Sequence, residues 1–252
     1  MHLTPSSLAL ARRLLAELLG TALLVTVVVG SGIAASALSP SDTGLQLLQN
    51  SIATALGLAV LIAVFGPASG AHFNPVVSLV DFALGRLERR GAPAHGLAPA
   101  ELTGYLTVQV LGAIGGAVLA NLMFEVPTAI ATTERVTGGT LLAEVVATAG
   151  LVLVILALAR AGRSAAIAPA VGAYIGAAYW FTSSTSFANP AVTIGRVFSD
   201  TFAGIAPNDV LPFIAAQLAG GALGALVAVF LHPRPTLAAD AARETASAVS
   251  TP

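Results

Sequence analysis

The stretch SFANPAVTIGRVFSD, residues 186–200, has Asn-Pro-Ala at the point where a hydrophobic run breaks off. Earlier in the chain, SGAHFNPVVSLVDFALGR, residues 69–86, nearly repeats it. Proline suits the first position of a helix, because its missing N–H would have no partner there. Asparagine suits the preceding N-cap position, where its side-chain oxygen accepts hydrogen bonds from backbone N–H groups. Each Asn-Pro pair therefore predicts the start of a short helix.

The composition of the chain indicates a membrane protein. Of its 252 residues, 56% are hydrophobic and only 9% are charged, whereas a soluble globular domain carries about 25% charged residues. The runs are continuously apolar, which disfavours a β-barrel, since the strands of a barrel alternate over about ten residues. We expect an all-α membrane protein with six transmembrane helices, because a spanning helix needs about 20 largely apolar residues. The six runs lie at 14–36, 46–65, 102–124, 141–160, 165–183 and 209–231.

The charges predict how the chain is oriented. Nine arginines lie on the side of the two termini and two on the opposite side. Because cytoplasmic loops are rich in basic residues, we expect a protein of the inner cell membrane with both termini in the cytoplasm. The tail 233–252 has no apolar helical face and is expected to be disordered. A signal peptide over the first run is a weaker alternative, since the run is long and Glu17 interrupts it.

Composition also limits the partners and the chemistry. A net charge of −1 argues against nucleic acid as a binding partner. The chain has no cysteine, which removes thiolate metal sites and cysteine nucleophiles. His72 stands apart from the other three histidines, so no metal site and no cofactor is expected.

The chain contains an internal duplication. LLAELLGTALLV at 14–25 matches LLAEVVATAGLV at 141–152, with the glutamates 127 residues apart. We expect one domain over 1–232, with repeats at about 11–124 and 139–232. Three spans in each repeat is an odd number, so the second repeat enters the membrane upside down. The landmarks are Glu17, Asn74 and Gln109 in the first repeat and Glu144, Asn189 and Gln217 in the second.

Inverted repeats often bring two half-helices together near the membrane midplane. A helix N-terminus carries about +0.5 of an elementary charge. Two such ends would repel cations, and the NH₂ groups of the two asparagines, left free by capping, would donate outward to a neutral molecule. Irregular backbone at this depth is tolerated where it lines a watery cavity. We expect the pore midplane to consist of Asn74, Pro75, Val76, Asn189, Pro190 and Ala191.

Glu17 and Glu144 are ionisable groups inside apolar spans, which points to a function. One option is a proton relay. The option that the duplication favours is scaffolding, in which each carboxylate accepts backbone N–H groups of one re-entrant loop.

On the Asn-Pro motifs, the paired glutamates and the paired glutamines, the chain resembles the aquaporin and aquaglyceroporin (major intrinsic protein) family over about residues 11–232. The resemblance implies six tilted helices, two re-entrant half-helices, one pore per subunit and a homotetramer in the lipid bilayer. It also implies that His72 lies at the cytoplasmic mouth of the pore.

Three departures from the family pattern stand out. One is that the connections from Gly57 to Asn74 and from Gly172 to Asn189 are short for the family, which leaves the register of the constriction residues open. Val76 replaces the usual alanine of the first motif, which predicts only local repacking. Val192 stands where family members usually have the constriction arginine, and the next arginine, Arg196, follows one helical turn later. The alternative is that the side chain of Arg196 reaches back to the constriction and restores the positive charge that Val192 removes. The resemblance suggests that the rest of a rather apolar constriction consists of Leu56, Ala177 or Tyr179, and Ser186.

The sequence therefore predicts a passive channel for water and small uncharged polar solutes. Bacterial family members that lack this arginine are associated with arsenic resistance, so the resemblance extends the solutes from glycerol to neutral arsenicals. A strict water channel that uses Arg196 is one alternative. A secondary transporter is another, and a membrane-embedded hydrolase is a third, although no nucleophile with a nearby base is evident.

Overall fold

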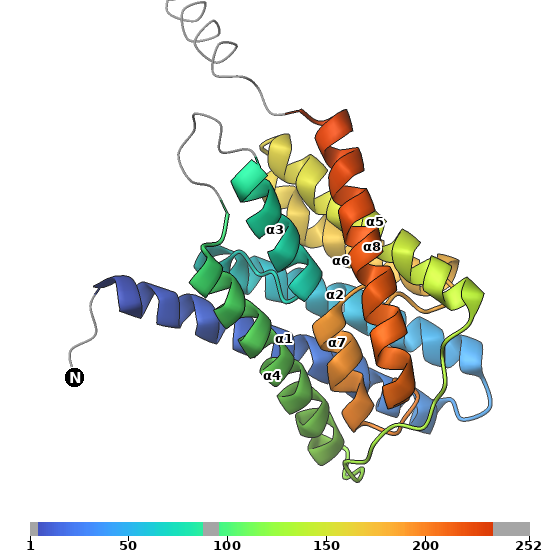
Figure 1. The fold of residues 1–252 in the computed structure, drawn as a ribbon. Coiled ribbons are helices and arrows are strands. Elements are labelled where there is room, and N and C mark those ends of the chain that lie inside the picture. Colours follow the sequence, from blue (N-terminus) through green and yellow to red (C-terminus); the bar gives the residue numbers. More distant parts are fainter. Residues whose placement is uncertain (1–4, 88–95, 234–252) are drawn as a thin grey trace, which may run out of the picture.

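The computed structural model describes residues 5–87 and 96–233 of the chain, and these residues form helices and connecting loops (Figure 1). In this described part, six helices are long and apolar enough to cross a membrane. They are α1 (Pro5–Leu38), α2 (Thr43–Ser69), α4 (Pro99–Met123), α5 (Gly138–Arg160), α6 (Ser164–Phe181) and α8 (Pro207–Leu231).

Two shorter helices begin at the Asn-Pro motifs. They are α3 (Pro75–Leu87) and α7 (Pro190–Gly195), and a 3₁₀ turn (Arg196–Phe198) follows α7. The prediction of six transmembrane helices with two additional short helices is confirmed. The predicted disordered tail lies, apart from residue 233, outside the described residues.

The helices form two matching groups (Figure 1). In the first group α1 packs against α4, and in the second α5 packs against α8. Helices α2 and α6 pack against each other and connect the groups. The short helices α3 and α7 each contact both α4 and α8, so they lie between the two groups.

Glycines set the close approach of the paired helices. A Cβ added to Gly112 of α4 would press against the carbonyl oxygen of Leu18 on α1. The matching pair in the second group is Gly220 of α8 and the carbonyl oxygen of Val145 on α5. Small residues at helix interfaces let backbones approach closely in membranes, where association depends on packing. The two groups thus use the same device at equivalent positions.

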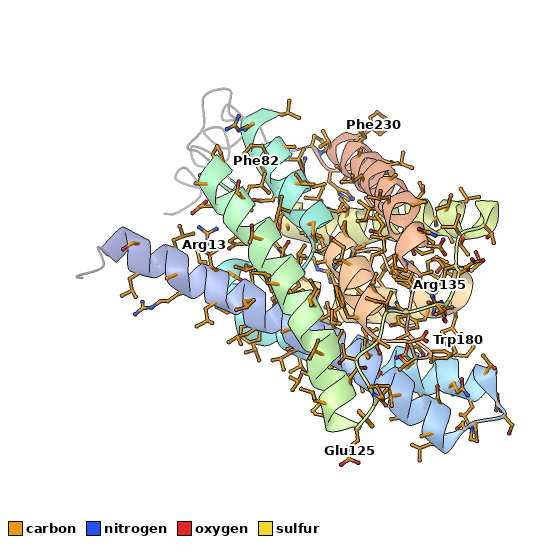
Figure 2. The ribbon with its side chains drawn as sticks, turned by 60° about the horizontal axis from the view of Figure 1, so that its bottom comes forward. Arg13, Phe82, Glu125, Arg135, Trp180 and Phe230 are labelled. Atoms are coloured by element: carbon orange, nitrogen blue, oxygen red, sulfur yellow. The ribbon has the colours of Figure 1, made fainter. Side chains whose placement is uncertain are left out.

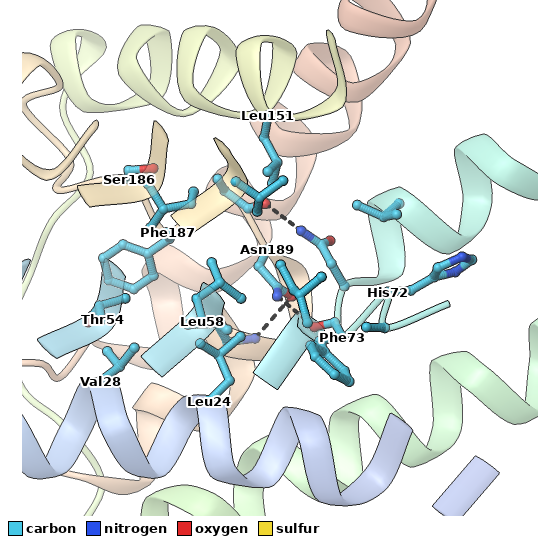
Figure 3. Close-up of a pocket in the computed structure, with 18 of the residues that line it drawn as sticks. Leu24, Val28, Thr54, Leu58, His72, Phe73, Leu151, Ser186, Phe187 and Asn189 are labelled. Carbon is cyan, nitrogen blue, oxygen red and sulfur yellow. Dashed lines mark hydrogen bonds between the residues drawn. The ribbon is translucent and has the colours of Figure 1, made fainter. Parts of the chain in front are cut away.

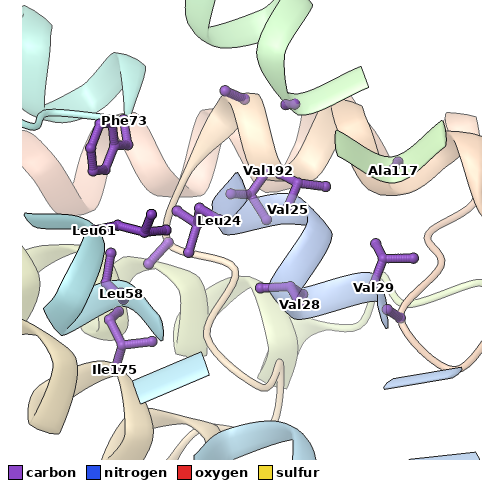
Figure 4. Packing of buried hydrophobic residues seen from close by; sticks show 14 of the residues in the cluster. Leu24, Val25, Val28, Val29, Leu58, Leu61, Phe73, Ala117, Ile175 and Val192 are labelled. Carbon is purple, nitrogen blue, oxygen red and sulfur yellow. The ribbon is translucent and has the colours of Figure 1, made fainter. Parts of the chain in front are cut away.

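The buried core is apolar and reaches the short helices. Val25 and Val29 of α1, Leu58 of α2 and Val192 of α7 belong to one buried cluster (Figure 4). On the outside, large apolar side chains such as that of Leu226 on α8 are exposed. An apolar outer surface of this kind suits contact with lipid tails.

The two ends of the helix bundle carry different side chains (Figure 2). Arg13, Phe82 and Phe230 lie toward one end, whereas Arg135 and Trp180 lie toward the other. We call these the Arg13 end and the Arg135 end. At the Arg13 end, Nη1 of Arg13 lies 2.5 Å from Oε1 of Glu101 on α4 in a salt bridge.

Candidate functional site: a passage between two short helices

Asn74 and Asn189 cap the two short helices. Oδ1 of Asn74 accepts a hydrogen bond from the backbone N–H of Val76 at 2.9 Å. Oδ1 of Asn189 accepts from the N–H groups of Ala191 at 3.0 Å and Val192 at 3.3 Å. These bonds satisfy N–H groups that have no partner inside the first turn of a helix. The Asn-Pro motif is therefore the local reason that both helices begin where they do.

The same two asparagines join the halves of the molecule (Figure 3). Nδ2 of Asn74 donates to the carbonyl oxygen of Ala188 at 2.8 Å. In return, Nδ2 of Asn189 donates to the carbonyl oxygen of Phe73 at 2.7 Å. The expectation that both NH₂ groups are free to donate outward is therefore wrong for one hydrogen of each. Since an amide NH₂ carries two donors, the other hydrogen remains for a molecule beside it.

Glu17 of α1 holds the loop that precedes α3. Its carboxylate accepts from the hydroxyl of Ser69 at 2.7 Å and from the backbone N–H groups of His72 at 2.9 Å and Phe73 at 2.7 Å. Nε2 of Gln109 on α4 also donates to it at 2.8 Å. The chain needs this support, because Phe73 has a φ of 50°. Such a conformation costs free energy in a non-glycine residue and persists only where its surroundings impose it.

Glu144 of α5 repeats the arrangement for the loop before α7. Its carboxylate accepts from the hydroxyl of Ser184 at 2.6 Å and from the N–H groups of Phe187 at 2.9 Å and Ala188 at 2.8 Å. Nε2 of Gln217 on α8 completes the set at 2.7 Å. Ala188, like Phe73, has a positive φ, at 48°. Both carboxylates are fully buried and are occupied by donors, which is the arrangement that scaffolding requires.

A cavity of about 60 Å³ lies beside the two asparagines. Figure 3 shows Ser186, Phe187 and Thr54 at one end of it, Asn189 near its middle and His72 at the other end. A second cavity, of about 220 Å³, continues past His72 and is lined in part by Asp81. The two cavities adjoin because they share six lining residues, namely Ile62, Ala71, His72, Val77, Ile155 and Val171.

His72 marks the boundary between the cavities. Its Nδ1 lies 3.1 Å from the hydroxyl of Ser78, and its ring meets the ring of Tyr105 edge-on at 5.4 Å. Within the described residues, no group of three His, Cys, Asp or Glu side chains is arranged to hold a metal ion. The histidine therefore belongs to the lining of the passage.

The opposite end of the first cavity, which we call the Ser186 end, has a mixed lining. The hydroxyls of Thr54 and Tyr179 lie 3.1 Å apart and share a hydrogen bond. Ser186, Val192 and Arg196 line the same cavity, and all three are buried. The expected apolar ring is therefore wrong, because hydroxyl groups and a guanidinium group take part in the lining.

Two residues predicted for the constriction lie elsewhere. Leu56 of α2 is 65% exposed and Ala177 of α6 is also exposed, and neither lines the cavity. Thr54, two residues from Leu56, lines it instead, and Tyr179, which was suggested as the alternative to Ala177, does line it. An α-helix turns about 100° per residue, so a displacement of two residues moves a side chain to nearly the opposite face.

The comparison with known proteins decides the family. The sequence profile of the family described as "Major intrinsic protein" matches residues 4–187. The chain belongs to this family. It is 48% identical over 239 residues to "Aquaglyceroporin AqpS" of Rhizobium meliloti (strain 1021), covering 94% of this chain and 97% of the relative. It is 31% identical to "Aquaporin Z" of Brucella melitensis biotype 1, covering 85% of this chain and 95% of the relative.

A solved structure supports the same fold. The X-ray structure of the aquaglyceroporin from Plasmodium falciparum matches with a TM-score of 0.63 at 21% identity, covering 89% of this chain and 96% of that chain. The major intrinsic proteins are membrane channels, and this multi-pass membrane protein is a channel protein rather than an enzyme.

In this major intrinsic protein, the bulk of Val76 is matched by a small residue opposite. Val76 of α3 is buried, and a Cβ added to Gly221 of α8 would collide with its Cγ1. At the equivalent positions of the other half, the chain has Ala191 on α7 and Ala113 on α4. One half thus pairs a large residue with glycine where the other has two alanines, which explains how the first motif tolerates valine.

Val192 and Arg196, where the sequence departs from the family pattern, both line the first cavity. Val192 belongs to the buried apolar cluster and lines the cavity. Arg196, in the 3₁₀ turn after α7, donates from Nε to the carbonyl oxygen of Ala203. Its guanidinium carbon lies 3.5 Å from the centroid of the Phe187 ring, within the range of a cation–π contact.

Sequence reasoning missed two residues of the Ser186 end, Thr54 and Phe187. Thr54 carries a usable signal, since it is a polar residue inside the apolar run 46–65. Phe187 carries no such signal, because an aromatic residue next to a motif is as compatible with packing in the core as with lining a cavity. Its position becomes evident only when Arg196 is seen above its ring.

Proposed function

We propose that the protein is an aquaglyceroporin-type channel, which conducts water and glycerol-like uncharged solutes passively across the membrane. The observation that carries the proposal is the cavity beside Asn74 and Asn189, which adjoins a second cavity at His72. Irregular backbone inside a membrane is tolerated where it lines such a space. The loops before α3 and α7 meet this condition.

The electrostatics of the passage favour neutral solutes. Among the described residues, no aspartate or glutamate lines the first cavity, whereas Arg196 does. The N-termini of α3 and α7 add partial positive charge. A pore selects by its diameter, its hydrogen-bonding groups and its electrostatic barriers, so these features disfavour cations and leave hydrogen-bonding neutral molecules as permeants.

The proposed solute class is broader than water. Val192 replaces the arginine that family members usually carry after the second Asn-Pro-Ala, and this removes a bulky cation from that position. The relative with 48% identity is named an aquaglyceroporin. We extend the class to neutral metalloid acids such as arsenous acid, because such molecules present hydroxyl groups and carry no charge.

A permeability panel in proteoliposomes tests this function. Water, glycerol, urea and arsenous acid are followed by stopped-flow light scattering or uptake, with protein-free liposomes as the control. The proposal predicts flux of water and glycerol above the control. Strong water flux with no glycerol, urea or arsenous acid flux would contradict the permissive channel.

A strict water channel is the second candidate, and one observation favours it. Arg196 is 3% exposed and lines the same cavity as Val192, so a positive group does remain near that end. The same panel separates the two candidates. A secondary transporter has less support, because Glu17 and Glu144 are occupied by backbone N–H groups and cannot serve as free ion-coupling sites.

The orientation and the assembly are further parts of the proposal. The excess of arginine at the Arg13 end supports a cytoplasmic location of both termini, and protease accessibility of a C-terminal tag in sealed vesicles tests it. The family resemblance supports a homotetramer, which native mass spectrometry tests. On this orientation, His72 faces the cytoplasmic mouth and Ser186 the outer one.

A further inference from the structure

Arg196 has unused donors in a buried position. Its side chain is 3% exposed and its Nε donates to the carbonyl oxygen of Ala203. Within the described residues, its two Nη atoms make no hydrogen bond, although Arg196 lines the cavity beside the asparagines. A guanidinium group offers five N–H donors in a fixed plane, so four of those of Arg196 have no acceptor among the described residues.

Ser186 adds a second unused polar group. Its residue is buried, and its hydroxyl has no hydrogen-bond partner among the described residues, yet it lines the same cavity. A buried polar atom without a partner costs about 1–3 kcal/mol, so such an atom in a native protein calls for an explanation. A permeating solute that carries oxygen atoms would supply the missing partner.

The guanidinium group of Arg196 forms no salt bridge with another described residue. In the described part of the chain, the one salt bridge joins Arg13 and Glu101 at the opposite end of the bundle. The nearby carboxylate of Glu144 is already occupied by the backbone of the loop before α7. A positive charge that is buried without a carboxylate partner acts on whatever enters the cavity, because little water screens it.

We propose that Arg196, one helical turn beyond the position that Val192 occupies, is the residue that determines solute specificity at the Ser186 end. Its guanidinium group and the hydroxyl of Ser186 bind the oxygen atoms of neutral hydroxylated solutes and exclude cations, while Val192 forms part of the apolar wall. The inference rests on the proposed channel function and assigns the selectivity of that channel to a particular side chain.

The loop after the 3₁₀ turn provides a matched control. Arg135 donates from Nε to the carbonyl oxygen of Gly204 at 2.6 Å and from Nη2 to that of Phe202 at 2.8 Å. Its guanidinium carbon lies 5.4 Å from the centroid of the same Phe187 ring. Arg135 therefore supports the same loop and contacts the same ring as Arg196, but it does not line the cavity. A purely structural role would make both arginines equivalent.

The experiment compares the wild-type channel with Arg196→Gln and Arg135→Gln in proteoliposomes. Fluxes of water, glycerol and methylammonium are measured and normalised to the amount of folded protein. We expect Arg196→Gln to raise methylammonium flux relative to water flux at least tenfold, which corresponds to about 1.4 kcal/mol. Arg135→Gln leaves this ratio unchanged, and Arg196→Lys, which keeps the charge, preserves most of the exclusion.

Ser186→Asp tests the same inference without altering Arg196. Ser186 has a φ of 53°, and aspartate is among the residues that adopt this region most readily. The new carboxylate would offset the charge of Arg196, so methylammonium flux rises here too. An unchanged methylammonium ratio in both Arg196→Gln and Ser186→Asp, or an equal change in Arg135→Gln, would overturn the inference. Absence of glycerol flux in the wild type would instead contradict the proposed function alone.

Discussion

Replacing Glu144 with alanine should destabilise the protein strongly while leaving the selectivity of the surviving channels unchanged. The substitution removes the acceptor for two buried backbone N–H groups, those of Phe187 and Ala188. Each buried donor left without a partner costs about 1–3 kcal/mol. The two together therefore cost about 2–6 kcal/mol, before the bonds from Ser184 and Gln217 are considered.

Glu144→Gln provides a graded comparison. A glutamine keeps one oxygen, which can still accept from Ser184 and Phe187. Its NH₂ group would face the N–H of Ala188, which then lacks an acceptor, whereas Gln217 can rotate its amide and accept in turn. With one unpaired donor instead of two, we expect a cost of about 1–3 kcal/mol.

The assay is thermal inactivation of the purified protein in detergent. The folded fraction is followed by size-exclusion chromatography after heating, and water and glycerol fluxes are then measured per folded molecule. Because unfolding of membrane proteins in detergent is commonly irreversible, the order of half-lives is compared rather than equilibrium values. The reasoning predicts the order wild type, Glu144→Gln, Glu144→Ala. An alanine variant as durable as the wild type, or a changed ratio of glycerol to water flux, would refute it.

Three further outcomes follow from the site. Gly221→Ala should destabilise the protein by about 1–3 kcal/mol through overpacking, and adding Val76→Ala should restore the loss; absence of rescue in thermal inactivation would contradict the packing argument. Val192→Arg should reduce glycerol flux at least tenfold while water flux persists, and equal reduction of both would count against the constriction at this end. Asn74→Asp keeps the helix cap but loses the donor to Ala188, so its half-life in detergent should shorten; a half-life equal to that of the wild type would argue against the cross-bond.

Local chemistry made part of this site predictable. Asparagine before proline specifies a capped helix start, and a glutamate repeated 127 residues later inside an apolar run needs a buried partner. Both statements depend only on what a residue type can bond. The cross-bonds from the two asparagines to Phe73 and Ala188 were not predictable, because they depend on how the two loops face each other.

The constriction was harder to predict because it depends on helix rotation. The family resemblance pointed to Leu56 on α2, but the chain between Leu56 and Asn74 passes through Pro67 and a left-handed Gly70 before it reaches the motif. A count of residues across such a turn does not fix the rotation of the preceding helix. Leu56 therefore faces outward, and Thr54 faces the cavity.

For Arg196, the position along the chain was predictable but the orientation of its side chain was not. Sequence spacing put it one turn beyond the family position and left its orientation open. Its orientation follows from the carbonyl of Ala203 and the ring of Phe187, which come from a later loop and an earlier one. Only the folded arrangement brings these groups together.

The central claim, that solutes pass through the cavity beside the two asparagines, can be tested with single cysteines, since the chain has none of its own. Thr54→Cys and Leu56→Cys differ by two residues on α2, and only position 54 lines the cavity. Water flux in proteoliposomes is measured before and after a thiol reagent and again after reduction. The account predicts that the reagent reversibly blocks Thr54→Cys and leaves Leu56→Cys unaffected. Block of Leu56→Cys alone, or of neither variant despite confirmed labelling of Thr54→Cys, would contradict it.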